Sequence, residues 1–169
     1  DCILAVLDRA LEGVSYDFAV FWEDMAYKTA SLLDPRHYRA IFLPHYQRIT
    51  DRLRAAGVET MMLDSDGNVE ELIPCWLDVG IRFIYPFEVA AGMDVVALRK
   101  RFGRSLVMGG GMDKRVLAGE PSGIRAMVEE KRPLIEEGGY VPGCDHAMPP
   151  DIPWSNYLLY RELLAEAGA

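Results

Sequence analysis

Five short runs of apolar, β-branched and aromatic residues alternate along the chain with longer segments whose apolar residues recur at helical spacing. Runs of about four to eight such residues, bounded by glycine, proline or acidic residues, are typical of buried strands. The predicted strands cover residues 16–22, 59–63, 81–85, 105–108 and 140–142. The predicted helices cover residues 2–11, 35–56, 69–79, 95–102, 122–137 and 154–167. Pro44 should kink or divide the second helix, because proline lacks the backbone N–H group.

Strand-then-helix units that repeat about every 35 residues predict parallel strands joined by crossover helices. Two architectures fit, an open doubly wound sheet and part of a barrel. An open sheet gathers ligands at one switch point, whereas a barrel collects functional groups from several strand ends. Each predicted strand here ends near a charged or thiol-bearing residue, so we expect an α/β fold that forms the C-terminal part, about five β/α units, of a TIM (β/α)8 barrel. Residues 1–169 would be a single partial barrel domain, and the absence of a Met before Asp1 indicates that N-terminal units are missing.

The stretch at residues 59–68 is the most strongly polar strand end. It changes abruptly from apolar residues to Asp64, Ser65, Asp66, Gly67 and Asn68. Residues two apart on an extended backbone point the same way, so Asp64 and Asp66 should project from one side of the strand. They could bind a divalent cation, act as acid and base, or hold a hydroxyl or amine, although Asp66 could instead shape the turn.

A capping box is also predicted just after this turn. Asn68 is a good N-cap residue, and Glu71 stands three residues further on. In a capping box the acid at this spacing bonds back to the N-cap backbone. We therefore expect the helix at 69–79 to begin at Asn68.

Cys144 and His146 follow the fifth predicted strand at a spacing that suits zinc ligands. A catalytic zinc site needs about three protein ligands, so Asp64, Asp66 or Glu88 would have to contribute. His146 could instead be a general acid or base, because imidazole titrates near neutrality. Cys144 could equally be a small residue in a tight loop.

Three glycines at 109–111 follow the fourth predicted strand, and Asp113 and Lys114 come next. Such glycines could cradle a phosphate, but no Lys-Ser/Thr pair follows, as a P-loop requires. Close packing where strand meets loop is the favoured interpretation. Asp113 could be a site acid or the cap of a helix.

Charge and composition narrow the class of partner. The net charge is -8, with 26 acidic residues interleaved among 18 basic ones. This excludes a nucleic-acid partner, which requires a basic face. The sequence contains neither a run of about 18 apolar residues nor a signal-peptide pattern, and its three Cys are widely spaced. We expect a cytoplasmic protein with free thiols and no membrane contact.

Several motifs, taken together in this order, resemble the C-terminal half of the uroporphyrinogen decarboxylase superfamily. The likeness runs from residue 14 to the end of the chain. The motifs are Glu23-Asp-Met-Ala-Tyr-Lys28, Asp64-Ser-Asp-Gly-Asn68, Pro86-Phe-Glu-Val-Ala-Ala-Gly-Met-Asp94, Leu98-Arg-Lys100, Gly109-Gly-Gly-Met-Asp-Lys114, Gly138-Gly-Tyr-Val-Pro142, Asp145-His-Ala-Met-Pro-Pro-Asp151 and Asn156. The superfamily includes porphyrinogen decarboxylases and corrinoid-dependent methyltransferases, so the resemblance implies a (β/α)8 barrel with its site at the strand ends.

The resemblance implies methyl transfer involving a corrinoid, with a small-molecule substrate. A corrinoid protein is an implied partner, and so is either the missing N-terminal half or a second copy. Zinc is an implied cofactor, although zinc-dependent members carry His-x-Cys where this chain has Asp64-Ser65-Asp66. The implied catalytic residues are Asp64, Asp66, His146 and Glu23, the substrate-binding residues Glu88, Asp113 and Tyr27, and the metal ligands Cys144, His146 and Asp64.

Two other functions remain open at this point. One is decarboxylation of a porphyrinogen or related carboxylate without a cofactor, in which Asp or His groups handle protons. The other is a non-catalytic half-barrel that needs an N-terminal partner to cover its open sheet edges.

Overall fold

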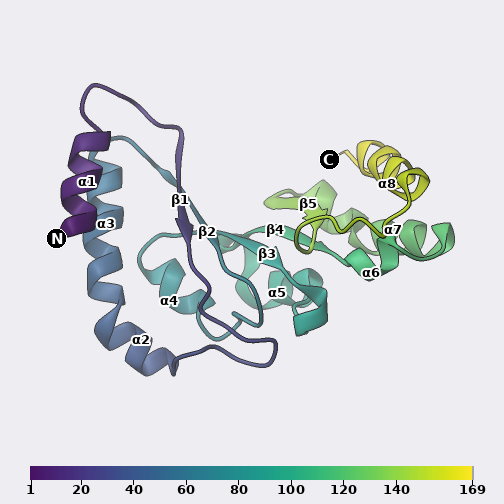
Figure 1. Ribbon diagram of the computed structural model, residues 1–169, viewed down its shortest axis with the longest axis horizontal. Coiled ribbons are helices and arrows are strands. Elements are labelled where there is room, and N and C mark those ends of the chain that lie inside the picture. Colours follow the sequence, from purple (N-terminus) through teal and green to yellow (C-terminus); the bar gives the residue numbers. More distant parts are fainter. Residues whose placement is uncertain (169) are drawn as a thin grey trace.

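The protein is built on one curved sheet of five parallel strands. The computed structural model describes residues 1–168. The strands lie side by side in the order β1-β2-β3-β4-β5, which is also their order in the sequence (Figure 1). They are β1 (Phe18–Trp22), β2 (Thr60–Asp64), β3 (Phe83–Phe87), β4 (Val107–Met112) and β5 (Tyr140–Cys144).

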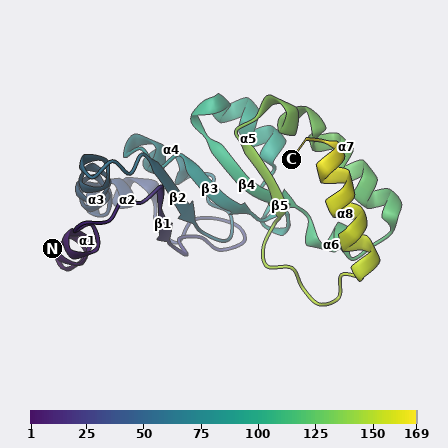
Figure 2. The ribbon, with the colours of Figure 1, turned by 90° about the horizontal axis from the view of Figure 1, so that it is seen from above.

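Helices connect the strands and cover one face of the sheet. Met61 and Leu63 of β2 are buried, whereas Met62 and Asp64, which point to the other face, are half-buried. Figure 2 shows α4, α5 and α7 on the same side of the sheet. The helices are α1 (Cys2–Ala10), α2 (Pro35–Ile41), α3 (Leu43–Ala55), α4 (Ile73–Asp78), α5 (Val95–Phe102), α6 (Lys114–Leu117), α7 (Pro121–Glu137) and α8 (Trp154–Glu166), with the 3-10 helices η1 (Val89–Ala91) and η2 (Gly103–Ser105).

The strand order decides between the two predicted architectures. A doubly wound sheet reverses its strand order at a switch point. Here every strand pairs in parallel with its successor, and the order never reverses. This is the winding of a (β/α)8 barrel, so the chain forms the C-terminal part of such a barrel, as predicted.

The helix predicted at residues 35–56 is divided, as its proline indicated. α2 ends at Ile41 and α3 begins at Leu43, with Pro44 in the first turn of α3. Proline is tolerated there because the first N–H groups of a helix have no partner within the helix.

The predicted capping box at Asn68 was wrong. α4 begins only at Ile73, four residues after the predicted start at residue 69. Pro74 lies in the first turn of α4. Asn68 instead donates from Nδ2 to the carbonyl oxygen of Ala91 at 3.0 Å, and its Oδ1 accepts from the backbone N–H of Glu70 at 3.4 Å. The residue therefore ties the turn after β2 to the η1 segment after β3.

The three glycines lie within β4 and not after it, which corrects the strand predicted at 105–108. Gly109, Gly110 and Gly111 pair with Val141, Pro142 and Gly143 of β5. A Cβ atom on Gly109 would come within 2.8 Å of the Phe83 ring. Close packing against β3 therefore requires glycine, in agreement with the favoured interpretation.

The core lies between the sheet and the helices. Trp76 of α4 is fully buried and donates from Nε1 to the Tyr38 hydroxyl at 2.8 Å, and its neighbour Cys75 is also fully buried. No helix in residues 1–168 is long and apolar enough to cross a membrane.

Candidate functional site

A cavity of about 440 Å³ lies at the carboxyl ends of the strands. This edge is where parallel α/β proteins bind their ligands. The cavity is lined by Trp22, Asp24, Asp64, Asp66, Tyr85, Pro86, Cys144, His146 and Ala147. The structure thus brings Asp64 and Asp66 from the second strand unit together with Cys144 and His146 from the fifth.

His146 and Asp66 form the direct polar contact across this cavity. His146 Nε2 lies 3.1 Å from Asp66 Oδ2, although the two residues are 80 positions apart in the sequence. Both side chains are partly exposed, at 42% and 39%. An imidazole held by a carboxylate can give or take a proton at a substrate atom in the cavity.

Asp64 lies in an unfavourable environment for its charge. Burial raises the pKa of Asp64, and the neighbouring carboxylates of Asp66 and Asp24 raise it further, against the opposing effect of His146. The cavity lining therefore contains three acidic side chains, those of Asp24, Asp64 and Asp66. Among positions 1–168, no Lys or Arg lines this cavity.

Replacing Asp64 with asparagine should stabilise the protein at neutral pH. A raised pKa means that the folded state disfavours the ionised form, so wild-type stability falls as the pH rises through the pKa of Asp64. The expected gain in the free energy of unfolding is about 0.5–1 kcal/mol, a modest value because solvent screens the open cavity. Urea denaturation at several pH values should show the gain near pH 7 and its disappearance toward pH 4.

Asp113→Asn is a matched control in which the change in stability should have the opposite sign. The hydrogen bond from the Arg115 side chain lowers the pKa of Asp113. The ionised form therefore stabilises the folded state, and this contribution is lost as the pH falls through the lowered pKa. Destabilisation of Asp64→Asn at neutral pH would contradict the proposed charge environment.

The predicted zinc ligands Cys144, His146 and Asp64 can be compared with the geometry that a zinc site requires. Within positions 1–168, no group of three or more His, Cys, Asp and Glu side chains is arranged to hold a metal ion. Burial raises the pKa of the Cys144 thiol, which favours its protonated form over the thiolate that binds zinc. The predicted ligands Cys144, His146 and Asp64 are therefore not arranged as a zinc site within positions 1–168.

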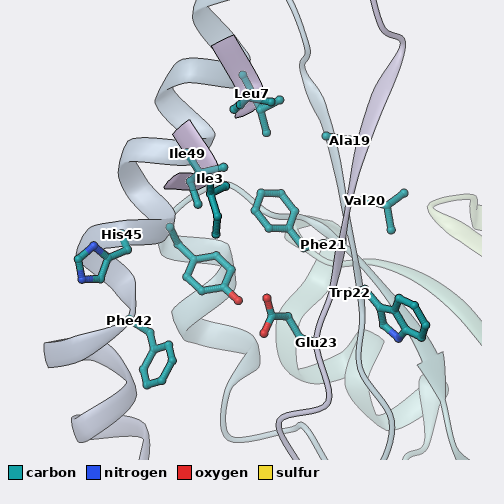
Figure 3. A pocket seen from close by; sticks show the side chains of 12 residues that line it. Ile3, Leu7, Ala19, Val20, Phe21, Trp22, Glu23, Phe42, His45 and Ile49 are labelled. Atoms are coloured by element: carbon teal, nitrogen blue, oxygen red, sulfur yellow. The ribbon is translucent and has the colours of Figure 1, made fainter. Parts of the chain in front are cut away.

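Glu23, predicted to be catalytic, faces away from this cavity. Figure 3 shows Phe21 and Glu23 on one side of β1 and Val20 and Trp22 on the other. Glu23 lines a different cavity, of about 490 Å³, between β1, α1 and α3. Burial raises the pKa of Glu23, a hydrogen bond with Tyr46 lowers it, and Asp24 raises it. The acid that β1 contributes to the cavity at the strand ends is Asp24.

The three predicted substrate-binding residues also lie outside the cavity lining. Glu88 accepts the backbone N–H of Gly67 at 2.9 Å and the Lys114 ammonium at 3.3 Å. Asp113 caps α6 through the backbone N–H of Arg115 at 2.8 Å. Tyr27 is exposed, and its backbone carbonyl accepts the N–H of Asn68.

The site residues predicted from the sequence did not include Asp24, Trp22 and Tyr85, which line the cavity. The period of two along a strand could have found them, because Val20 and Trp22 lie on one face of β1 and the next position on that face is residue 24. Tyr85 is paired in register with Asp64 and belongs to the same face of the sheet. Burial raises the pKa of Tyr85, and the Asp64 carboxylate adds to this rise.

Comparisons with known proteins agree with the fold and identify the family. The solved structure of a methyltransferase from Methanosarcina mazei superposes with a TM-score of 0.63 at 18% sequence identity. The match covers 90% of this chain and 43% of that chain, so this chain spans less than half of its length. A search of curated proteins found no match. The sequence model named "Uroporphyrinogen decarboxylase (URO-D)" matches residues 14–166. Because this match extends over nearly the whole chain, the protein belongs to the uroporphyrinogen decarboxylase family.

Proposed function

We propose that the protein carrying this chain transfers a methyl group from a small molecule to a corrinoid. The observation that carries the proposal is the acid-lined cavity with the His146–Asp66 pair at the strand ends. The fold is shared with the methyltransferase from Methanosarcina mazei, so methyl transfer is the first reaction to test.

The charge of the cavity supports methyl transfer over decarboxylation of a porphyrinogen. Asp24, Asp64 and Asp66 line it, and positions 1–168 contribute no Lys or Arg to its lining. A substrate with many carboxylates would be repelled by these side chains, since like charges brought together in a partly dry site cost free energy. A methyl ether or thioether carries no such charge.

The His146–Asp66 pair would supply the proton that the departing group requires. The bond between the methyl carbon and its oxygen or sulfur breaks, and the electron pair stays on the heteroatom. His146 donates a proton to that atom, so the product leaves as a neutral alcohol or thiol. Asp66 holds the imidazole in position.

A reduced corrinoid would supply the nucleophile that accepts the methyl group. The cavity of about 440 Å³ suits a small molecule. A corrin ring would approach the open side of this cavity. We therefore treat the corrinoid as a co-substrate presented by a separate corrinoid protein, and the cavity as the place that holds the methyl donor in line.

The test is a methyl-transfer assay with the full-length protein. Reduced corrinoid is mixed with a panel of methyl ethers and methyl thioethers, and methylation is followed by the absorbance of the corrinoid. We expect substrate-dependent methylation for at least one donor. Release of carbon dioxide from a porphyrinogen, without any corrinoid methylation, would instead favour the decarboxylase.

A further inference from the structure

We propose that Lys114 is a positioning residue that holds the His146–Asp66 pair together without entering the cavity. This inference rests on the proposed function for its kinetic test. Lys114 is absent from the cavity lining, and no motif argument gave it this role. Lys114 belongs to a closed set of contacts, the contact ring, which joins the ends of four strands.

The contact ring begins and ends at the His146–Asp66 pair. Asp66 is followed by Gly67, whose backbone N–H donates to Glu88 Oε2 at 2.9 Å. Lys114 Nζ donates to Glu88 Oε1 at 3.3 Å. The same nitrogen lies 3.9 Å from Asp145 Oδ1. Asp145 is followed by His146, whose Nε2 returns to Asp66 at 3.1 Å.

Asp145 is the deepest member of the contact ring. Its side chain is fully buried, at 0% exposure, yet it lies between the two cavity residues Cys144 and His146 in the sequence. It accepts backbone N–H groups from Val89 and Lys114, each at 3.1 Å. The carboxylate therefore anchors the end of β5 to the segments that follow β3 and β4.

Lys114 is the cation of the contact ring. Its ammonium group lies between the carboxylates of Glu88 and Asp145, and its side chain is 25% exposed. Without this charge the two acids would repel each other across a partly buried space. Glu88 would then shift together with the turn that carries Asp66, and Asp145 with the segment that carries His146.

Replacing Lys114 with methionine tests this role. Removing a group that orients a reactive residue without touching the substrate typically lowers activity about 10–100-fold. We expect Lys114→Met to lower kcat for methyl transfer by this factor with little change in KM, because the substrate contacts remain. Lys114→Arg should recover most of the activity, since it restores the positive charge.

A spectroscopic readout separates positioning from general instability. In 15N-labelled protein at one fixed pH, the NMR signals of the His146 imidazole nitrogens report the contact with Asp66. The imidazole signals of His37 and His45 are internal references. In Lys114→Met, the His146 signals should move toward those of Asp66→Asn while the other two stay in place. If Lys114→Met does not fold, Glu88→Gln provides the same test, because it keeps an acceptor for Gly67 but loses the charge that attracts Lys114.

Unchanged His146 signals and unchanged kcat in a folded Lys114→Met protein would overturn the proposal. Equal movement of all three histidine signals would do the same, because it would indicate a general structural effect. Failure of the proposed function is distinguishable from both. In that case the wild-type protein transfers no methyl group, and the His146 signals alone decide whether Lys114 positions the pair.

Discussion

Replacing His146 with glutamine should slow methyl transfer by about 10²–10⁴-fold, the usual contribution of a positioned proton donor. Glutamine can still donate a hydrogen bond to Asp66, whose Oδ2 lies 3.1 Å from the native Nε2. It cannot give up a proton to the departing oxygen or sulfur, so that atom would leave as an anion into a cavity that already holds three carboxylates. The loss should appear in kcat, with KM nearly unchanged, in steady-state assays of corrinoid methylation.

Two further variants sharpen this prediction. His37 lies on α2, is exposed and does not line the cavity, so His37→Gln should retain wild-type kcat. Asp66→Asn keeps the imidazole but removes the carboxylate that holds it in position, so its kcat should lie between those of the wild type and His146→Gln. Wild-type kcat in His146→Gln for every accepted donor would show that the proton comes from another group.

The fold could be predicted from the sequence because its units are local and repeated. Each strand is a short apolar run, and the segments between strands show helical spacing. What the pattern could not show is where elements end. The strand predicted at 105–108 runs from Val107 to Met112, because its pairing with β5 continues through the three glycines. Glycines have no side chain from which a sequence pattern could show this.

The site could be predicted only in part, for a geometric reason. Asp64, Asp66, Cys144 and His146 line one cavity because the carboxyl ends of parallel strands share one edge of the sheet. Strand order therefore places them together without any knowledge of side-chain contacts.

The sequence did not show on which face of a strand each acidic side chain lies. Glu23 and Asp24 are adjacent in the sequence, but Glu23 turns toward Tyr46 and α3, whereas Asp24 lines the cavity. The contact ring through Glu88, Lys114 and Asp145 joins residues that follow three different strands. Such lateral contacts depend on rotamers and loop shapes, so no pattern in a single sequence reveals them.

Gly111→Ala should reduce the free energy of unfolding by about 2–5 kcal/mol. Gly111 has φ of +74°, a left-handed conformation that costs other residues about 1–2 kcal/mol. An added Cβ would also lie 2.6 Å from Val95 Cγ1, at the buried start of α5. Overpacking of this kind typically reduces stability by a further amount of about 1–3 kcal/mol. Chemical denaturation of the variant and the wild type measures the sum.

Gly57→Ala isolates the steric part of this cost. Gly57 has φ of +86°, similar to that of Gly111, but a Cβ there would meet no atom within 4 Å. The control should therefore lose only the conformational contribution, about 1–2 kcal/mol. A larger loss for Gly111→Ala than for Gly57→Ala would mean that β4 needs glycine because α5 packs directly on its backbone. Equal losses would contradict this close packing and would reopen the possibility that the glycines of β4 leave space for a ligand.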